Sequence, residues 1–425
     1  MQKSITINEW ESSDLVNLTK QEIDFLNDKV NEGKSNSKIE ILTKGNDQYY
    51  LKATSWIGTI KLPTSHSITI KPKVGNLNFF KMLTYCENYD GIQFFDPVYA
   101  SEGKDLVYFM GKLFVDTIRP IIEEGIYKNY VPIIDEIPAV KGRLLLSENI
   151  RHPRLTHEKF WCEHDELTEN IMENQVLLYC THLLSIFIRN DDVGNELNHI
   201  QQFFENHGVS LTFLESYHLD SISLQKHNEH YEKALLLCEF ILKIIWYNDF
   251  TREENLPIYG FLYNMNTLYQ KFVTKIVQEI LIGYDVYAEL KNDDMLIHIQ
   301  QPNYTTNQIQ RVILKPDIVI KNKQSKDSIL ILDTKYKEKV STSDIYQSLA
   351  YSITFECPTI LLIPEFGSKI LDGFMLNPKF KKDAQIFVRS IDFSDVVNFI
   401  EKTKFEIKTT ISPFLKSVKE LSNFV

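Results

Sequence analysis

The sequence predicts a multidomain protein of mixed α+β and α/β class, with a β-rich N-terminal domain, a helical middle region and a C-terminal mixed sheet flanked by helices. The chain of 425 residues is too long for one ordinary hydrophobic core. Its composition, 43% hydrophobic and 24% charged, is that of a globular protein and excludes a disordered one. The period of the hydrophobic residues changes twice, which predicts domains at 1–140, 141–255 and 256–425.

The first 140 residues carry mostly short strand patterns. Ile68 and Ile70 alternate with Thr69 and Lys71, and a period of two is typical of a half-buried strand. The elements expected in this region are strands at 49–53, 56–61 and 67–73 and helices at 77–85 and 111–123.

The middle region has helical spacing. Apolar side chains recur every three or four residues between 170 and 189, which predicts a helix with one apolar face. A denser pattern predicts a more buried helix at 229–247. Asp191, Asp192 and Gly194 favour a loop at 190–196.

The C-terminal region returns to strands between helices. Helices are predicted at 261–281 and 344–355. The strands expected around them are 285–290, 295–300, 312–320, 328–333, 359–364 and 384–388. This order predicts an α/β sandwich with a mixed sheet.

Charge and cysteine usage limit the function classes. The net charge of −11 excludes a polycation that coats nucleic acid along its whole length. Five cysteines without a CxxC pair argue against a disulfide framework or zinc knuckle and favour a reducing cytoplasm. The N-terminus has no apolar signal region, and no apolar run is long enough to span a membrane. We therefore expect a cytoplasmic protein with no membrane partner.

The residues that suggest chemistry lie between 311 and 339. Asp317 interrupts one apolar run, and Asp333 and Lys335 end the next. Side chains two apart on a strand point to the same face, so Asp333 and Lys335 should project together. If the two runs form a hairpin, Asp317 comes alongside Asp333.

Two adjacent carboxylates repel each other and need a cation between them, and their hard oxygen atoms suit Mg²⁺. A bound Mg²⁺ can polarise a phosphoryl oxygen and lower the pKa of water, while a lysine can orient that water and stabilise negative charge. Asp317 and Asp333 are thus predicted metal ligands, with Lys335 as the third catalytic residue of a phosphodiester-hydrolysis site.

The neighbouring charge fits a polyanionic substrate. Residues 311–339 contain eight basic and four acidic side chains, and a local basic surface attracts phosphates. For Lys321, Lys323 and Lys326, an alternative is that they only keep a turn soluble.

A following helix adds Gln347 and Tyr351, which are four residues apart and share one helix face. Pro316-Asp317, then Asp333-Thr334-Lys335, then this Gln-xxx-Tyr element together resemble the PD-(D/E)xK nuclease superfamily. Within it, the chain resembles the McrC family, the nuclease subunits of McrBC-type modification-dependent restriction systems. The likeness runs from about residue 55 to 365 and includes segments 58–75, 141–143 and 162–174.

The resemblance implies a PD-(D/E)xK fold in the C-terminal domain and a Mg²⁺-dependent endonuclease that cleaves double-stranded DNA in phage defence. It implies an N-terminal region that engages and stimulates a McrB-like AAA+ GTPase hexamer. The absence of a G-x-x-x-x-G-K-S/T motif agrees with GTP hydrolysis in such a partner. Gln347 and Tyr351 would then be secondary site residues that orient the lysine or contact the backbone.

The chain departs from the superfamily at one position. The helix before the first core strand often carries a Glu that completes the metal site, whereas this helix carries Gln270. Gln270 either ligates weakly through its amide oxygen or is a solvated helix residue.

Two rival functions remain open. One is a non-catalytic adaptor that keeps a nuclease-like fold only to dock on and activate an AAA+ ring, and Gln270 favours it. The other is a stand-alone structure-specific nuclease that needs neither partner nor nucleotide.

Overall fold

The computed structural model describes the chain in segments: 3–31, 37–45, 48–63, 66–87, 106–151, 159–189, 191–214, 216–226, 228–247, 258–290, 292–299, 309–375, 384–395 and 397–421. By their contacts the residues form two compact units. The first contains residues 1–57, 63–100 and 263–425, and the second contains residues 58–62 and 101–262. This grouping follows contacts rather than chain order, so the domain boundaries near 140 and 255 stay a prediction.

The N-terminal part of the first unit begins with a parallel strand pair. β1 (Lys3–Asn8) pairs with β6 (His66–Lys71), and the register sets Ile5 opposite Ile68 and Ile7 opposite Ile70. All four isoleucines are buried, as expected for the core face of a strand pair.

A small antiparallel sheet and two helices complete this part. The sheet has the order β2 (Val16–Asn17), β4 (Gln48–Ala53), β3 (Ile39–Gly45). Helix α1 (Lys20–Phe25) begins with a capping box between Thr19 and Glu22 and continues as a π-helical turn. Helix α2 (Asn76–Glu87) and strand β5 (Trp56–Lys61) lie where a helix and a strand were predicted.

The rest of the first unit is built on a six-stranded mixed sheet in the order β12-β15-β16-β17-β19-β18. The strands are β12 (Tyr284–Ala288), β15 (Ile318–Asn322), β16 (Ser328–Thr334), β17 (Thr359–Glu365), β19 (Gln385–Asp392) and β18 (Leu371–Met375). β12, β15 and β16 are antiparallel to one another in turn, whereas β16, β17 and β19 are parallel. The mixed sheet predicted for this region is confirmed.

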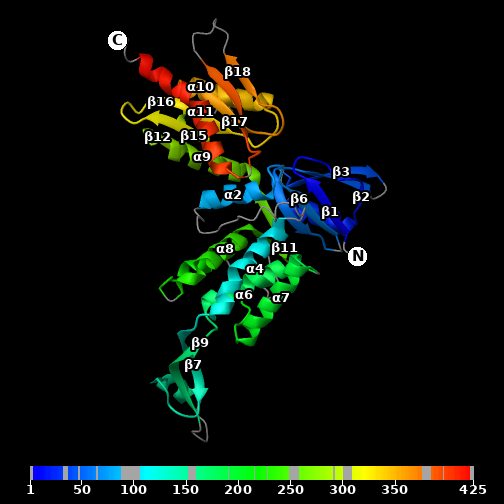
Figure 1. Ribbon diagram of the computed structural model, residues 1–425, viewed down its shortest axis with the longest axis vertical. Coiled ribbons are helices and arrows are strands. Elements are labelled where there is room, and N and C mark those ends of the chain that lie inside the picture. Colours follow the sequence, from blue (N-terminus) through cyan, green and yellow to red (C-terminus); the bar gives the residue numbers. More distant parts are fainter. Residues whose placement is uncertain are drawn as a thin grey trace, which may run out of the picture. The chain divides into compact units, whose positions relative to one another are not determined.

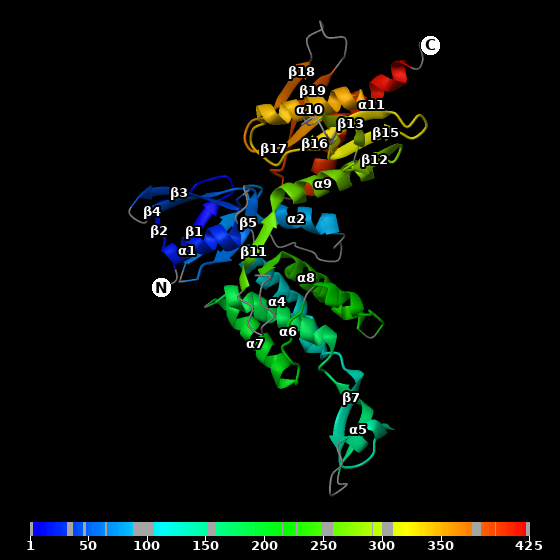
Figure 2. The same ribbon diagram turned by 180° about the vertical axis from the view of Figure 1, so that it is seen from behind.

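Helices cover both faces of this sheet. α10 (Thr342–Phe355) connects β16 to β17 and packs Tyr351 against Val319 and Ile331. α9 (Met265–Ile280) and α11 (Phe399–Leu421) pack together, with the rings of Phe272 and Phe399 stacked at 5.6 Å. α11 lies in front of the sheet in Figure 1 and α10 in front of it in Figure 2. A separate ribbon is formed by β13 (Asn292–Ile299) and β14 (Ile309–Leu314).

The second unit combines helices with short strands. Its longer described helices are α4 (Leu106–Glu124), α6 (Met172–Phe187), α7 (Asp192–Asn206) and α8 (Glu232–Ile244). The buried Tyr231 hydroxyl donates to Asn174 and accepts from the Tyr127 N–H, both at 2.8 Å. β10 (Ile245–Tyr247) pairs with β11 (Ile258–Asn264).

The second unit also carries a three-stranded antiparallel sheet in the order β7-β9-β8, beside helix α5 (Leu146–Arg151) (Figures 1 and 2). The strands are β7 (Asn129–Ile137), β9 (Phe160–Thr168) and β8 (Arg143–Leu144). Gly142 precedes β8 with φ +67, and a Cβ there would lie 2.3 Å from the Glu163 carbonyl oxygen. Glycine is therefore required at this crossing.

Two predicted elements of the C-terminal region were wrong in extent. The single strand at 312–320 is two strands, β14 and β15, because Pro316 has no N–H to donate to a ladder. The helix at 261–281 begins only at Met265, where the Asn264 side chain accepts from the Asn266 N–H, and the preceding residues belong to β11.

The middle region also differs from the prediction. It is not purely helical, because β8 and β9 lie within it, and the helix predicted at 229–247 ends at Ile244. The loop at 190–196 was wrong from Asp192 onward: Asp191 caps α7 by accepting from the Gly194 N–H at 2.8 Å. Among the described helices, none combines the length and apolar character needed to cross a membrane.

Candidate active site

Asp333 and Lys335 lie at the end of β16, in the middle of the six-stranded sheet. Asp333 is 1% exposed, and the Lys335 Nζ lies 2.8 Å from its Oδ2 as an ion pair. The Lys335 N–H donates to the Leu362 carbonyl at 2.9 Å, so the backbone at the lysine is still held against β17. The two side chains project together, as the spacing of two predicted.

Asp317 reaches the same place from the neighbouring strand. β15 and β16 form the predicted hairpin with Ile318 opposite Leu332, and the next pair along this ladder is Asp317 and Asp333. Asp317 Oδ2 accepts from both the N–H and the hydroxyl of Thr334, at 2.7 and 2.6 Å. The hairpin therefore brings both predicted carboxylates together, and Thr334 fixes the orientation of one of them.

Burial and the neighbouring carboxylate of Asp317 disfavour the charged form of Asp333. Burial, followed by the charge of Asp317, raises its pKa from 3.8 to about 6, although Lys335 acts in the opposite direction. Its Oδ2 is paired with the Lys335 ammonium at 2.8 Å. A buried carboxylate beside a second carboxylate is costly when it is ionised, and a bound cation would lower that cost.

These residues fit a Mg²⁺ ion. Mg²⁺ is commonly held by one or two carboxylates and keeps several water ligands. Asp317 and Asp333 would be two such carboxylate ligands. Within the described segments, no group of three Asp, Glu, His or Cys side chains is arranged to hold a metal ion.

Gln347 and Tyr351 lie on α10, beside the segment that leads into Asp317. The Gln347 Nε2 donates to the Tyr351 hydroxyl at 2.8 Å, and this hydroxyl donates to the Lys315 carbonyl at 3.1 Å. Burial raises the pKa of Tyr351 to about 12, and the charges of Asp333 and Asp317 add to the rise. The pair thus holds the chain's own backbone before Pro316-Asp317. Its expected role, to orient the lysine or contact the backbone, stays a prediction.

Gln270 is directed to a residue that the sequence did not single out. Its Nε2 donates to Glu289 Oε1 at 3.3 Å, and Glu289 Oε2 pairs with the Lys315 Nζ at 2.7 Å. The Glu289 N–H donates to the Asp317 carbonyl at 2.8 Å. Glu289 directly follows β12 and Asp317 directly precedes β15, whose neighbour β16 carries Asp333. Glu289 has φ +50, a left-handed conformation rare for a non-glycine residue. A signal was available: Glu289 ends a strand pattern, as Asp333 does.

The lysines of the hairpin turn make local contacts, far along β15 from Asp317. The contacts are Lys321 with the Tyr287 ring, Lys323 with the Ile282 carbonyl and Lys326 with Asp285. This agrees with the alternative that they serve the turn.

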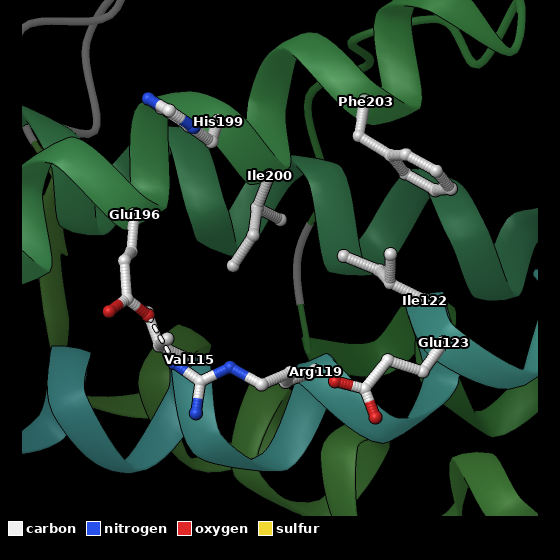
Figure 3. A pocket seen from close by; sticks show the side chains of 8 residues that line it. All are labelled: Val115, Arg119, Ile122, Glu123, Glu196, His199, Ile200 and Phe203. Atoms are coloured by element: carbon white, nitrogen blue, oxygen red, sulfur yellow. Dashed lines mark hydrogen bonds and ion pairs between the residues drawn. The ribbon is translucent and has the colours of Figure 1, made fainter.

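A separate cavity of about 420 Å³ lies between α4 and α7 of the second unit (Figure 3). The Arg119–Glu196 ion pair, at 2.5 Å, lies beside the apolar side chains of Val115 and Ile200. The lining residues are Val115, Arg119, Ile122, Glu123, Glu196, His199, Ile200 and Phe203. None of the predicted site residues belongs to it.

Comparison with known proteins gives three consistent findings. The sequence model of the family described as McrBC 5-methylcytosine restriction system component matches residues 51–363, which include Gln270 and all residues from Asp317 to Tyr351. The type IV methyl-directed restriction enzyme EcoKMcrBC of Escherichia coli K12 is 24% identical over 330 residues, covering 72% of this chain and 87% of that protein. The fold matches a chain of the Thermococcus gammatolerans half-complex of McrB AAA+ hexamers with bound McrC, with TM-score 0.67, 17% identity, and 96% and 100% coverage.

Proposed function

Because the chain belongs to the family of McrBC 5-methylcytosine restriction system components, we propose that it is the DNA-cleaving subunit of such a system. In this proposal the six-stranded sheet with α9, α10 and α11 is a PD-(D/E)xK nuclease domain, and the substrate is double-stranded DNA. One observation carries it: the buried Asp333 and the partly exposed Lys335, paired at 2.8 Å, meet Asp317 through the β15–β16 hairpin.

Each site residue has a role that its contacts support. Asp317 and Asp333 would hold Mg²⁺, which when bound supplies a Lewis acid for the phosphoryl oxygen and an acidified water. Thr334 fixes Asp317 through two hydrogen bonds. The Lys335 ammonium orients the attacking water and stabilises the negative charge that grows on the phosphate.

Tyr351 and Gln347 act on the backbone next to Asp317 rather than on the metal ion. By holding the Lys315 carbonyl, they fix the entry of the chain into Pro316-Asp317. A ligand carboxylate needs such support, because small displacements of first ligands weaken metal binding.

We further propose that the chain assembles with an AAA+ GTPase hexamer and stimulates it. The fold match to a chain from the McrB–McrC assembly supports this. The β7-β9-β8 sheet offers a contact surface: Tyr130 and Leu167 stand opposite each other and are 66% and 51% exposed. Exposed apolar side chains in such a group are typical of a protein contact.

The test is cleavage of methylated plasmid DNA by the chain with its partner, GTP and Mg²⁺. Asp333→Asn should abolish cleavage and leave partner binding and GTPase stimulation intact. Asp327→Asn, in the exposed turn of the same hairpin, is the matched control and should cleave normally. Unchanged cleavage by Asp333→Asn would overturn the nuclease proposal.

The adaptor reading has one observation in its favour, the neutral Gln270 engaged with Glu289 rather than with Asp317 or Asp333. It predicts that the purified complex never cleaves, while GTPase stimulation persists. Cleavage by the chain alone with Mg²⁺ would instead indicate a stand-alone nuclease.

A further inference from the structure

The residue after Lys335 connects the site to the N-terminal strands. Tyr336 is 2% exposed, and its hydroxyl donates to Glu9 Oε2 at 3.0 Å. β16 ends at Thr334, and the Lys337 N–H donates to the Lys335 carbonyl at 3.0 Å, so Tyr336 is the central residue of a tight turn directly after Lys335. Its ring packs against Tyr269 of α9 and Phe366, both with centroids at 5.7 Å.

Glu9 directly follows β1, and burying its carboxyl group there costs free energy of folding. Its side chain is fully buried, and Oε2 also accepts from the Lys73 N–H at 3.2 Å, while Oε1 has no hydrogen-bond partner. The next residue, Trp10, has φ +65, and its buried Nε1 also lacks a partner. Left-handed backbone at a bulky residue and unpaired buried polar atoms each cost free energy.

The carboxyl group provides two directional contacts, because its Oε2 accepts from the Tyr336 hydroxyl and from the Lys73 N–H. An apolar side chain of similar size would remove the unpaired Oε1 but would leave the buried Tyr336 hydroxyl without this acceptor. Of the two contacts, the one with Tyr336 reaches the segment next to Lys335.

A second contact joins the same two segments. The Lys73 Nζ pairs with Glu338 and lies 5.9 Å from the ring of Phe366, which packs on Tyr336. The segment from Lys335 to Glu338 is therefore held by the N-terminal strands on one side and by Asp333 and Leu362 on the other.

We propose that Glu9 is a positioning residue of the nuclease site: through Tyr336 it fixes the backbone on which Lys335 stands, so the N-terminal strand β1 sets the place of the catalytic ammonium. The expected effect on DNA cleavage rests on the proposed function. The expected effect on the position of Lys335 does not, and it can be measured separately.

Three variants of the full chain test the proposal in the complete complex. Glu9→Leu removes the acceptor and Tyr336→Phe removes the donor, and each should lower the single-turnover cleavage rate about tenfold with DNA affinity unchanged, as expected for a loss of about 1.4 kcal/mol of transition-state stabilisation. Glu9→Gln retains an acceptor oxygen and should retain most of the rate. The double variant Glu9→Leu/Tyr336→Phe should be no slower than Glu9→Leu, because Glu9→Leu has already broken the hydrogen bond that Tyr336→Phe removes.

Two measurements separate positioning from folding. The double variant Glu9→Leu/Tyr336→Phe removes acceptor and donor together and should unfold at a higher temperature than Glu9→Leu, which leaves the Tyr336 hydroxyl buried without this acceptor, although both cleave equally slowly. Glu22→Gln is the control: it alters another buried N-terminal carboxyl group, which contacts His66 rather than the nuclease sheet.

The ¹³C signal of reductively methylated Lys335, assigned with Lys335→Arg, reports the ammonium position without any cleavage. It should shift in Glu9→Leu and Tyr336→Phe and stay in place in Glu22→Gln. An unchanged signal, or rate losses that multiply in the double variant, would overturn the inference. A shifted signal in a complex that never cleaves DNA would contradict the proposed function but would still support the role of Glu9 in positioning Lys335.

Discussion

Thr334 donates two hydrogen bonds, from its N–H at 2.7 Å and its hydroxyl at 2.6 Å, to the same carboxylate oxygen of Asp317. The strand that carries Asp333 thereby also orients the opposing carboxylate. The two acidic side chains are consequently arranged before any cation arrives.

Thr334→Val should weaken this arrangement without changing side-chain volume much. Loss of the hydroxyl removes one of the two bonds to Asp317, which costs about 1 kcal/mol of stability. We expect about tenfold more Mg²⁺ to be needed for half-maximal cleavage. Thr334→Ser keeps the hydroxyl and should behave as the native chain in the same titration; equal Mg²⁺ requirements in both variants would contradict the role of Thr334.

Asp333→Asn should stabilise the metal-free protein at neutral pH. The folded pKa of about 6 lies above the unfolded value of 3.8, so the native state binds this proton more tightly. The contribution is present below pH 3.8 and is lost as the pH rises through 6. The variant does not titrate there, and its advantage in free energy of unfolding should grow between pH 4 and 6 to about 3 kcal/mol.

Thermal unfolding in EDTA at pH 5 and pH 8 measures this difference. Mg²⁺ should then stabilise the native chain at pH 8 and leave Asp333→Asn unaffected, since only a bound ligand shifts the unfolding equilibrium. A variant that is less stable at every pH would show that Lys335 outweighs the burial of the carboxylate.

Gln270→Ala should change the Mg²⁺ requirement less than threefold, because the amide donates to Glu289 rather than facing Asp317 or Asp333. Calorimetric titration with Mn²⁺ measures the same property without DNA. Asp317→Asn is the reference and should lose most of the affinity. A loss of equal size in Gln270→Ala would restore the amide as a metal ligand.

Tyr130→Ser with Leu167→Ser should weaken stimulation of the GTPase partner about tenfold, since the pair offers apolar area that only a partner can bury. Cleavage depends on assembly and should fall in parallel. Ile282→Ser removes an apolar side chain that is 80% exposed in the other unit and should have no effect. Normal stimulation by the double variant would exclude this sheet as the contact surface.

The central residues of the site could be predicted because their geometry is local. A spacing of two on a strand brings Asp333 and Lys335 to one face, and a hairpin is enough to add Asp317. The break between β14 and β15 could also have been predicted, because Pro316 cannot donate a hydrogen bond to a ladder. The continuous apolar run on both sides of Pro316 concealed this signal.

Other features depend on contacts that no local pattern reveals. Glu289 gains its place beside Asp317 through a strand pairing and a left-handed φ, and Glu9 meets Tyr336 from the far end of the chain. Helix α11 was missed for another reason. Buried Phe399, Ile407 and Ile411 follow helical spacing, but charged neighbours dilute the signal.

The hydrogen bond between Glu9 and Tyr336 spans 327 positions of the chain. At roughly 5–20 residues per second, a ribosome adds Tyr336 about 16 to 65 seconds after Glu9. During that interval β1 and β6 can pair, yet the carboxyl group at their end stays hydrated, with nothing to cover it. The helical second unit is synthesised within this wait, so it can finish folding while the sheet that bears Asp333 does not yet exist.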